Sequence, residues 1–304
     1  MCAAPILEVA QNAEASMRIS NQMLFQNTLR GLRLNLEALD RAQQEAATGR
    51  KIRTVSDNPI DSSMLMQLDA RLRQMDQYRR NATAANTRLS AEDQVLTTVR
   101  DLLAQAKDVA ASGATEDPAD PLRQVALVQV NEIRDQVISL GNTKIGNEYI
   151  FAGTRSTTAP FLPDGTYQGN TTVRQAEIDE GILTDTNHTG QPLLTDALAG
   201  LDRLIQELTS GTPDSIQQAV ADLSTAEDAV LVAQAEVGVR LRLIADVGTQ
   251  LAQRSTDSLV QQAGLRDADP TESVVKVLAA QTALERAYEM AGRILSINIL
   301  DYLQ

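Results

Sequence analysis

The chain is 304 residues long, and 43% of its residues are hydrophobic, which is enough to build a core. Only 3% are aromatic and tryptophan is absent, so the core must come from Leu, Ala, Val and Ile, which suits helix-on-helix packing. The 27 basic and 40 acidic residues give a net charge of −13, which argues against nucleic acid as a partner. The single cysteine, Cys2, excludes an intrachain disulfide and a cysteine-based metal site.

The charge is unevenly distributed. Residues 18–53 contain seven basic and three acidic residues, a net +4, whereas residues 161–235 contain two arginines and twelve acidic residues, a net −10. The acidic stretch is typical of a solvated outer region.

The first predicted helix covers residues 19–48, and Gly49 suits its C-terminal cap. Its apolar side chains recur at alternating spacings of four and three, as in a coiled-coil seam: Phe25, Leu29, Leu32, Leu36, Leu39, Gln43 and Ala46. Residues 1–16 contain Pro5 and only a short apolar patch, so we expect this extension to be disordered and dispensable. It lacks the basic and apolar regions of a cleaved signal peptide.

Two long helices are predicted in the middle of the chain. Asn58-Pro59 suits the start of the first, with Asn58 as N-cap. Its predicted seam is Leu65, Leu68, Leu72, Met75, Arg79, Ala82, Asn86, Leu89, Asp93, Leu96, Arg100, Leu103 and Ala106. The four polar members of this seam recur every seven residues, which suggests register-setting or partner-facing positions.

The second long helix is predicted at 216–265, opened by Thr212-Pro213. Its seam is Ile216, Ala219, Leu223, Glu227, Val230, Gln234, Val237, Leu241, Ile244, Gly248, Leu251, Ser255, Ser258, Gln262 and Leu265. Two helices of similar length on either side of an insertion should lie side by side. Shorter helices are predicted at 121–142 and 194–208.

The insertion at 147–190 has a different composition. Half of the eight Phe and Tyr residues of the chain lie in it. Turns are predicted at Pro163-Asp164-Gly165 and Glu180-Gly181, with strand-like segments on both sides of the second. We expect a small β subdomain that faces outward and is not required for assembly.

A last helix repeats the coiled-coil pattern at Val274, Val277, Gln281, Leu284, Tyr288, Ala291 and Leu295. Both terminal helices also carry apolar residues off their seams, such as Leu34, Leu278 and Ile294. A two-helix contact cannot bury all of these, so the pattern predicts neighbouring molecules. The predicted assembly interface is Phe25, Leu29, Leu32, Leu36, Leu39, Val274, Val277, Leu284, Tyr288, Leu295, Ile299 and Leu303.

The expected fold is therefore mainly α. Long coiled-coil helices from both halves of the chain should form an elongated rod with the β subdomain at its far end. The expected parts are the extension 1–16, a terminal polymerisation domain (17–50 with 268–304), a rod domain (51–146 with 191–267) and the insertion 147–190.

The sequence does not contain the residues of common catalytic sites. The single histidine, His188, lies in a polar turn, and one His with one Cys forms neither a triad nor a zinc site. We therefore expect no enzyme and no cofactor. Residues Asp185, Asn187, Thr189, Gly190 and Asp196 match ligand positions of a calcium loop, but Pro192 interrupts it and the last ligand is not Glu, so calcium stays a minor alternative to a plain turn.

Several segments resemble the flagellin superfamily, and within it the proteins of the hook–filament junction. They are, in order, Met17-Arg18-Ile19-Ser20, Ala47-Thr48-Gly49-Arg50-Lys51, Ser56-Asp57-Asn58-Pro59, Asn142-Thr143, Tyr149-Ile150-Phe151-Ala152-Gly153-Thr154, Pro160-Phe161, Tyr167-Gln168-Gly169, Val237-Gly238-Val239-Arg240-Leu241 and the tail 295–303. Their order and spacing cover essentially all of 17–304. The chain departs from the family in Asn58, where many relatives have Asp, and in the sixteen residues before Met17.

The resemblance implies a structural subunit exported through the flagellar type III apparatus, with an export chaperone, without a cleaved signal peptide. Outside the cell it would form a ring of like subunits between the hook-side junction protein and the flagellin filament, with no membrane insertion. Two alternatives remain: a flagellin-like filament subunit, and a cytoplasmic coiled-coil adaptor. An adaptor should fold its termini in isolation, whereas a polymer subunit should keep them disordered until assembly.

Overall fold

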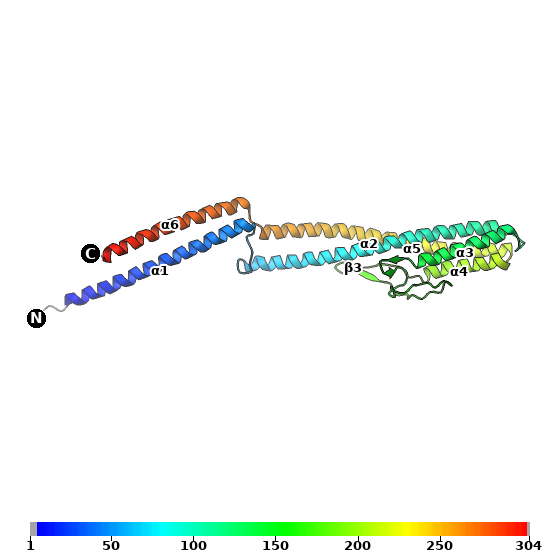
Figure 1. Ribbon diagram of the computed structural model, residues 1–304, viewed down its shortest axis with the longest axis horizontal. Coiled ribbons are helices and arrows are strands. Elements are labelled where there is room, and N and C mark those ends of the chain that lie inside the picture. The colour runs from blue at the N-terminus through cyan, green and yellow to red at the C-terminus, as the bar shows by residue number, and fades with distance from the viewer. Residues whose placement is uncertain (1–4, 303–304) are drawn as a thin grey trace. The chain divides into compact units, whose positions relative to one another are not determined.

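A computed structural model describes the backbone of residues 5–302 and the side chains of residues 23–293. The fold is mainly α, as predicted (Figure 1). The helices are α1 (Pro5–Thr48), α2 (Pro59–Gly113), α3 (Pro121–Gly141), α4 (Leu193–Ser210), α5 (Pro213–Arg266) and α6 (Pro270–Tyr302). The strands are β1 (Lys144–Ile145), β2 (Glu148–Tyr149), β3 (Gln175–Asp179) and β4 (Ile182–Asp185).

The helix starts follow a common local rule. All the helices of the described chain except α4 begin with proline, which has no amide hydrogen to leave unpaired and already has a helical φ. The residue before the proline often caps the helix: Asn58 accepts from Ile60 N at 3.1 Å, and Asp120 accepts from Leu122 N at 2.8 Å. These caps explain why the predicted starts at Pro59 and Pro121 are correct.

The chain divides into two compact units, and their boundaries lie inside α2 and α5. The first unit contains residues up to Ala70 and from Asp257 onward, and the second contains Arg71–Thr256. We expected the boundaries in the connections near residues 50 and 268 instead, which are the loops between the long helices.

The first unit contains α1 and α6, which lie side by side and antiparallel (Figure 1). Gly49, with φ of 65°, ends α1, and its carbonyl accepts from Ala268 N at 2.9 Å. Residues 5–16, which we expected to be disordered, continue α1 in the structure. Pro5 occupies the first helical position and no residue from 6 to 24 is a glycine or proline, so nothing in the sequence breaks the helix. Residues 1–4 lie outside the described part.

The second unit packs α3 and α4 against each other and against the paired α2 and α5. Antiparallel pairing of α2 and α5 within this unit is shown by the contacts of Lys107 with Glu227 and of Gln234 with Thr97. The seams of both helices are shifted by one residue at several positions where we predicted polar members, whereas the predicted polar members Ser258 and Gln262 of α5 are buried. Tyr78, Ala85, Glu92 and Val99 are buried in α2, and Ala226, Ala233 and Val247 are buried in α5. The predicted seam residues at 79, 86, 93, 100, 227, 234 and 248 lie beside the buried stripe.

The predicted β insertion is present, and it packs on the helices. β3 and β4 form an antiparallel hairpin whose turn contains Gly181 with φ of 71°, a conformation that favours glycine. Ile178 is fully buried, and Asn81 of α2 donates to the Glu177 carbonyl at 2.8 Å. Of Tyr149-Ile150-Phe151, only Tyr149 belongs to a strand, the two-residue β2, because Ile150 and Phe151 enter the core.

Candidate assembly interface

Small side chains form much of the contact between α1 and α6. The buried residues of this pair are Ala42, Ser273 and Ala291. Gly31, Ala38, Ala280 and Ala287 are half-buried beside them. Small residues let two helices approach closely, but they bury little apolar area and leave the larger side chains elsewhere.

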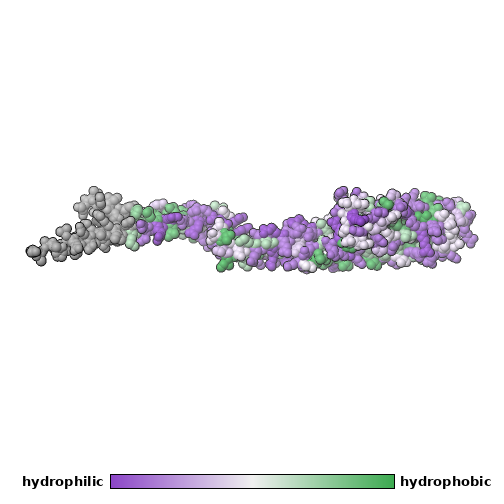
Figure 2. All heavy atoms as spheres, turned by 90° about the horizontal axis from the view of Figure 1, so that it is seen from below, coloured by the Kyte–Doolittle hydropathy of each residue, from purple (hydrophilic) through white to green (hydrophobic). Residues whose placement is uncertain are grey.

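Many of the larger apolar side chains of the pair are exposed. Phe25, Leu29, Leu36, Val274, Leu278 and Tyr288 are each at least 41% exposed. Figure 2 shows hydrophobic residues at the surface of the described part of this pair. Scattered exposed leucines are ordinary, but a run of this kind on two paired helices is typical of an interaction surface.

Helix geometry places these residues on one side of the pair. With about 100° per residue, Phe25, Leu29 and Leu36 lie about 100–140° from the buried Ala42 on the contact line of α1, all in the same direction. Val274, Leu278 and Tyr288 lie about 60–140° from the contact line of α6, in the same rotational sense. Because the helices are antiparallel, the same sense on both places the two stripes on one face. We call these six residues the apolar flank.

The structure separates the predicted interface residues into three groups. Half-buried between α1 and α6 are Leu32, Leu39, Val277 and Leu284. Exposed on the apolar flank are Phe25, Leu29, Leu36, Val274 and Tyr288. Leu295, Ile299 and Leu303 fall outside the described side chains. The sequence pattern alone did not separate the contact within the chain from the surface beside it.

An ion pair sets the register of the two helices near the end of α1. Lys276 Nζ donates to Glu45 Oε1 at 2.9 Å, and Ser273 lies at 3.5 Å from the same oxygen. The hydrogen bonds of Lys276 with Glu45 and then with Glu272 raise its pKa. Lys276 therefore stays charged at physiological pH.

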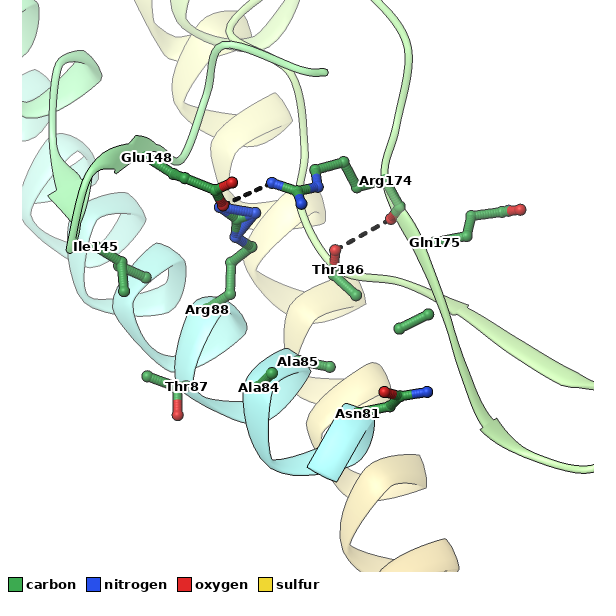
Figure 3. Close-up of a pocket in the computed structure, with 11 residues that line it drawn as sticks. Asn81, Ala84, Ala85, Thr87, Arg88, Ile145, Glu148, Arg174, Gln175 and Thr186 are labelled. Carbon is green, nitrogen blue, oxygen red and sulfur yellow. Dashed lines mark hydrogen bonds and ion pairs between the residues drawn. The ribbon is translucent and has the colours of Figure 1, made fainter. Parts of the chain in front are cut away.

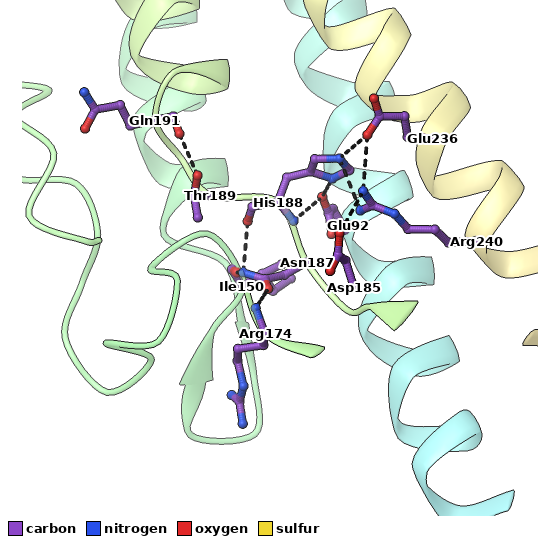
Figure 4. A network of polar contacts seen from close by, with 10 residues as sticks. All are labelled: Glu92, Ile150, Arg174, Asp185, Asn187, His188, Thr189, Gln191, Glu236 and Arg240. Carbon is purple, nitrogen blue, oxygen red and sulfur yellow. Dashed lines mark hydrogen bonds and ion pairs between the residues drawn. The ribbon is translucent and has the colours of Figure 1, made fainter. Parts of the chain in front are cut away.

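The second unit contains a polar network that the sequence did not reveal (Figure 4). Glu92 of α2 is fully buried, and its Oε1 lies 3.0 Å from the His188 backbone nitrogen and 2.5 Å from His188 Nδ1. His188 Nε2 lies 3.0 Å from Glu236 of α5. Burial lowers the pKa of His188. The hydrogen bond to Glu92, the negative charge of Glu92 and the hydrogen bond to Glu236 raise this pKa by more, so the net shift is upward.

Arg123 is a second feature that the sequence did not reveal. It is fully buried in α3, and it donates to four carbonyls: Thr115 at 2.9 Å, Glu207 at 2.7 Å, Leu208 at 2.7 Å and Gly211 at 2.6 Å. Three of these carbonyls lie at the C-terminal end of α4, where the helix dipole favours a cation. The charged guanidinium therefore joins the end of α4 to the loop before α3.

Two oxygen-bearing side chains of the possible calcium loop, those of Asn187 and Thr189, have protein partners. The Asn187 side chain accepts from Arg174 N at 2.9 Å and donates to the Ile150 carbonyl at 3.2 Å. The Thr189 hydroxyl donates to the Gln191 carbonyl at 2.6 Å. This loop fixes the β insertion to the core. Among the described residues, no group of three or more His, Cys, Asp or Glu side chains is arranged to hold a metal ion, and no helix is long and apolar enough to cross a membrane.

A pocket of about 390 Å³ lies between α2 and the β insertion (Figure 3). Arg88 and Arg174 both contact Glu148 Oε2, at 2.6 and 2.7 Å. The hydrogen bond from Arg174 lowers the pKa of Glu148. These three charged residues connect the insertion to α2, because the Glu148 carboxylate accepts hydrogen bonds from Arg88 of α2 and from Arg174 of the insertion.

Comparisons with known proteins agree with this architecture. Residues 19–156 match the model of the bacterial flagellin N-terminal helical region. Flagellar hook-associated protein 3 of Escherichia coli is 28% identical over 90% of this chain and 95% of its own length, and its Salmonella typhimurium counterpart is 24% identical over the same shares. Among solved structures, a flagellar hook-associated protein from Vibrio parahaemolyticus has a TM-score of 0.64 and 23% identity over 69% of this chain and all of its own. Bacillus cereus FlgL has a TM-score of 0.58 and 22% identity over 65% of this chain and 99% of its own.

Proposed function

The chain belongs to the flagellin superfamily as a structural protein of the flagellar hook–filament junction, and we propose that it assembles there through the apolar flank of its terminal helices. This family assignment implies a structural role rather than an enzymatic one. The observation that carries the proposal is that the six large apolar residues of the apolar flank remain exposed although α1 and α6 are already paired.

Association with a neighbouring subunit would bury the exposed side chains of the apolar flank. Burying a large apolar side chain is worth about 1.5–3 kcal/mol, so six exposed ones represent a substantial driving force for association. When the flank of one copy packs on a different surface of the next copy, the contact is head-to-tail and repeats into a ring or a helical assembly. We propose a ring of such subunits, with the hook-side junction protein on one side and flagellin on the other.

Export is the remaining part of the proposal. A subunit of a structure outside the cell must leave the cytoplasm, and we propose that this one uses the flagellar type III apparatus with an export chaperone. The N-terminal segment that precedes α2 would carry the export signal, as the resemblance to the superfamily implies. A flagellin-like filament subunit and a cytoplasmic adaptor are not favoured by the relatives, both of which are hook-associated proteins.

Deletion and complementation test this proposal. A strain lacking the gene should secrete flagellin into the medium and carry hooks without filaments, and the wild-type chain should restore them. A chain with Leu29→Glu and Leu36→Glu should be secreted at the normal level and still fail to restore filaments. The matched control places two acidic residues at exposed polar positions of the same helix, Gln26→Glu and Gln43→Glu, and should complement. Full complementation by the Leu29/Leu36 variant would refute the role of the flank.

A further inference from the structure

A second pocket lies in the first unit, beside the connection between α1 and α2. It has a volume of about 260 Å³. Arg50, Arg53 and Arg266 contribute its basic groups, and Val55 and Met66, both more than half exposed, contribute apolar surface. A pocket with cationic and aliphatic walls is suited to a segment that carries both a carboxylate and an aliphatic side chain.

Ser62 gives this pocket an unusual polar atom. The residue is only 5% exposed, and its Oγ is buried without a hydrogen-bond partner in the described part of the chain. A helical serine hydroxyl commonly bonds to the carbonyl four residues back, as the Thr28 hydroxyl does to the Leu24 carbonyl at 2.8 Å, but the Ser62 hydroxyl makes no such bond. Because an unpaired buried hydroxyl costs free energy, the Ser62 hydroxyl is poised to pair with an incoming acceptor.

The positive charge of the pocket is not fully neutralised. Asp69 is its only acidic lining residue, and its Oδ1 accepts from Gln262 at 2.5 Å. Arg266 pairs with Asp267 at 2.8 Å, and Arg53 donates to the neutral Gln44. No partner of the Arg50 side chain occurs within the described residues. Asp69 lines the pocket, Asp267 pairs with Arg266 and Asp57 interacts electrostatically with Arg53, so Arg50 is the lining guanidinium group left without a described acidic partner.

Complementary chemistry is exposed elsewhere on the same chain. The loop between α2 and α3 and the first turn of α3 carry Glu116, Asp117 and Asp120, followed by Leu122, which is 62% exposed. No basic residue lies between 108 and 122. This segment offers carboxylates and an aliphatic side chain within a few residues, which is what the pocket is suited to bind.

We propose that the pocket around Ser62 binds the acidic segment 114–122 of a second copy of this chain. A carboxylate would accept from the Ser62 hydroxyl and from Arg50 or Arg266, and Leu122 would cover Val55 and Met66. This contact rests on the proposed function. In addition to the contacts of the apolar flank, it would provide a polar contact that sets the orientation of neighbouring copies. It joins two different surfaces and is therefore head-to-tail.

The experiment titrates the full-length chain, at a concentration where it is monomeric, with a labelled peptide of residues 114–122. The control peptide replaces Glu116, Asp117 and Asp120 by their amides. We expect saturable binding of the acidic peptide that weakens with added salt, and at least about tenfold weaker binding of the amide peptide. Equal binding of both peptides, or binding of neither, would overturn the proposal.

Variants of the pocket separate recognition from folding. Ser62→Ala should leave the melting temperature of the free chain unchanged or raise it, because the hydroxyl has no partner there, while it weakens peptide binding. Arg50→Gln should weaken binding, and Arg73→Gln, an exposed arginine on α2, should not. A lowered melting temperature for Ser62→Ala with unchanged binding would assign the hydroxyl to the fold and refute the proposal. Since these measurements use the monomer, their failure leaves the junction role to be decided by the deletion strain.

Discussion

His188 Nδ1 lies 2.5 Å from Oε1 of the fully buried Glu92, and this contact fastens the β insertion to α2. The other ring nitrogen has two neighbours: Glu236 at 3.0 Å and Arg240 Nη1 at 3.3 Å. A protonated imidazole donates to both glutamates, whereas a neutral one keeps its Nδ1–H bond to Glu92 and can accept from Arg240. The protonation state of His188 therefore selects its partner on α5.

The first prediction concerns pH. The folded pKa of His188 is raised, so its extra stabilisation is fully present below the unfolded pKa of about 6.5 and is lost as pH rises through the folded pKa. Thermal unfolding of the wild type and of His188→Gln should therefore differ most near about pH 6, where we expect about 1.5–3 kcal/mol, and less near about pH 9. A difference that does not change between these pH values would contradict this assignment.

Arg123 should be among the most sensitive positions of the second unit. Arg123→Met keeps much of the side-chain volume but leaves four carbonyls without their donor, so we expect a loss of about 3–5 kcal/mol in the free energy of unfolding. Urea titration followed by circular dichroism measures it. The exposed Arg73→Met should change stability by less than about 0.5 kcal/mol. Similar midpoints for the two variants would show that the carbonyls find other donors.

A glutamate introduced in the buried contact between α1 and α6 and a glutamate introduced on the apolar flank should have different effects. The single chain already contains α1 and α6 as paired helices, which differs from our expectation that the ends of a polymer subunit are disordered before assembly. Ala42→Glu places a carboxylate in the buried contact between them, so it should reduce the helical signal of the monomer. Leu36→Glu places the same group on an exposed position, so the helical signal should remain within error while assembly is lost. Circular dichroism of dilute monomer distinguishes them. A loss of helix in Leu36→Glu would place that residue in the fold of the monomer.

Replacing the β insertion should lower the free energy of unfolding of the second unit, although the sequence predicts an outward-facing subdomain. A Gly/Ser linker in place of 162–188 removes the fully buried Ile178 and the His188 contact to Glu92, so we expect the second unit to lose at least about 2–5 kcal/mol. The control Leu183→Ser changes an exposed residue of the same hairpin and should be nearly neutral. Urea unfolding decides between them. Unchanged stability after the replacement would show that the insertion does not support the core.

The sequence predicts the helices well because proline starts, polar caps and repeating leucines are local signals. Its errors in the long seams have a physical cause. From a given leucine, the residue three positions on and the residue four positions on are adjacent in sequence and differ by about 100° around the helix. Where the buried one of the two is an alanine, such as Ala85 or Ala233, its weak apolar character does not show in the sequence which of the two is buried.

The candidate interface was only partly predictable for a related reason. Periodicity finds the apolar residues of α1 and α6, but not which of them the other helix covers. That depends on the small residues, such as Ala42 and Ala291, at which the helices approach. The roles of Glu92 and Arg123 depend on segments distant in sequence, which no local pattern reveals.

Immunogold labelling of isolated flagella with antibodies against the purified chain tests the central claim most directly. The account predicts a single narrow band of gold at the boundary between hook and filament, absent from flagella-associated material of the deletion strain. Labelling along the whole filament would identify a filament subunit instead. Gold confined to the cytoplasm of sectioned cells, with none on the flagella, would contradict the junction role altogether.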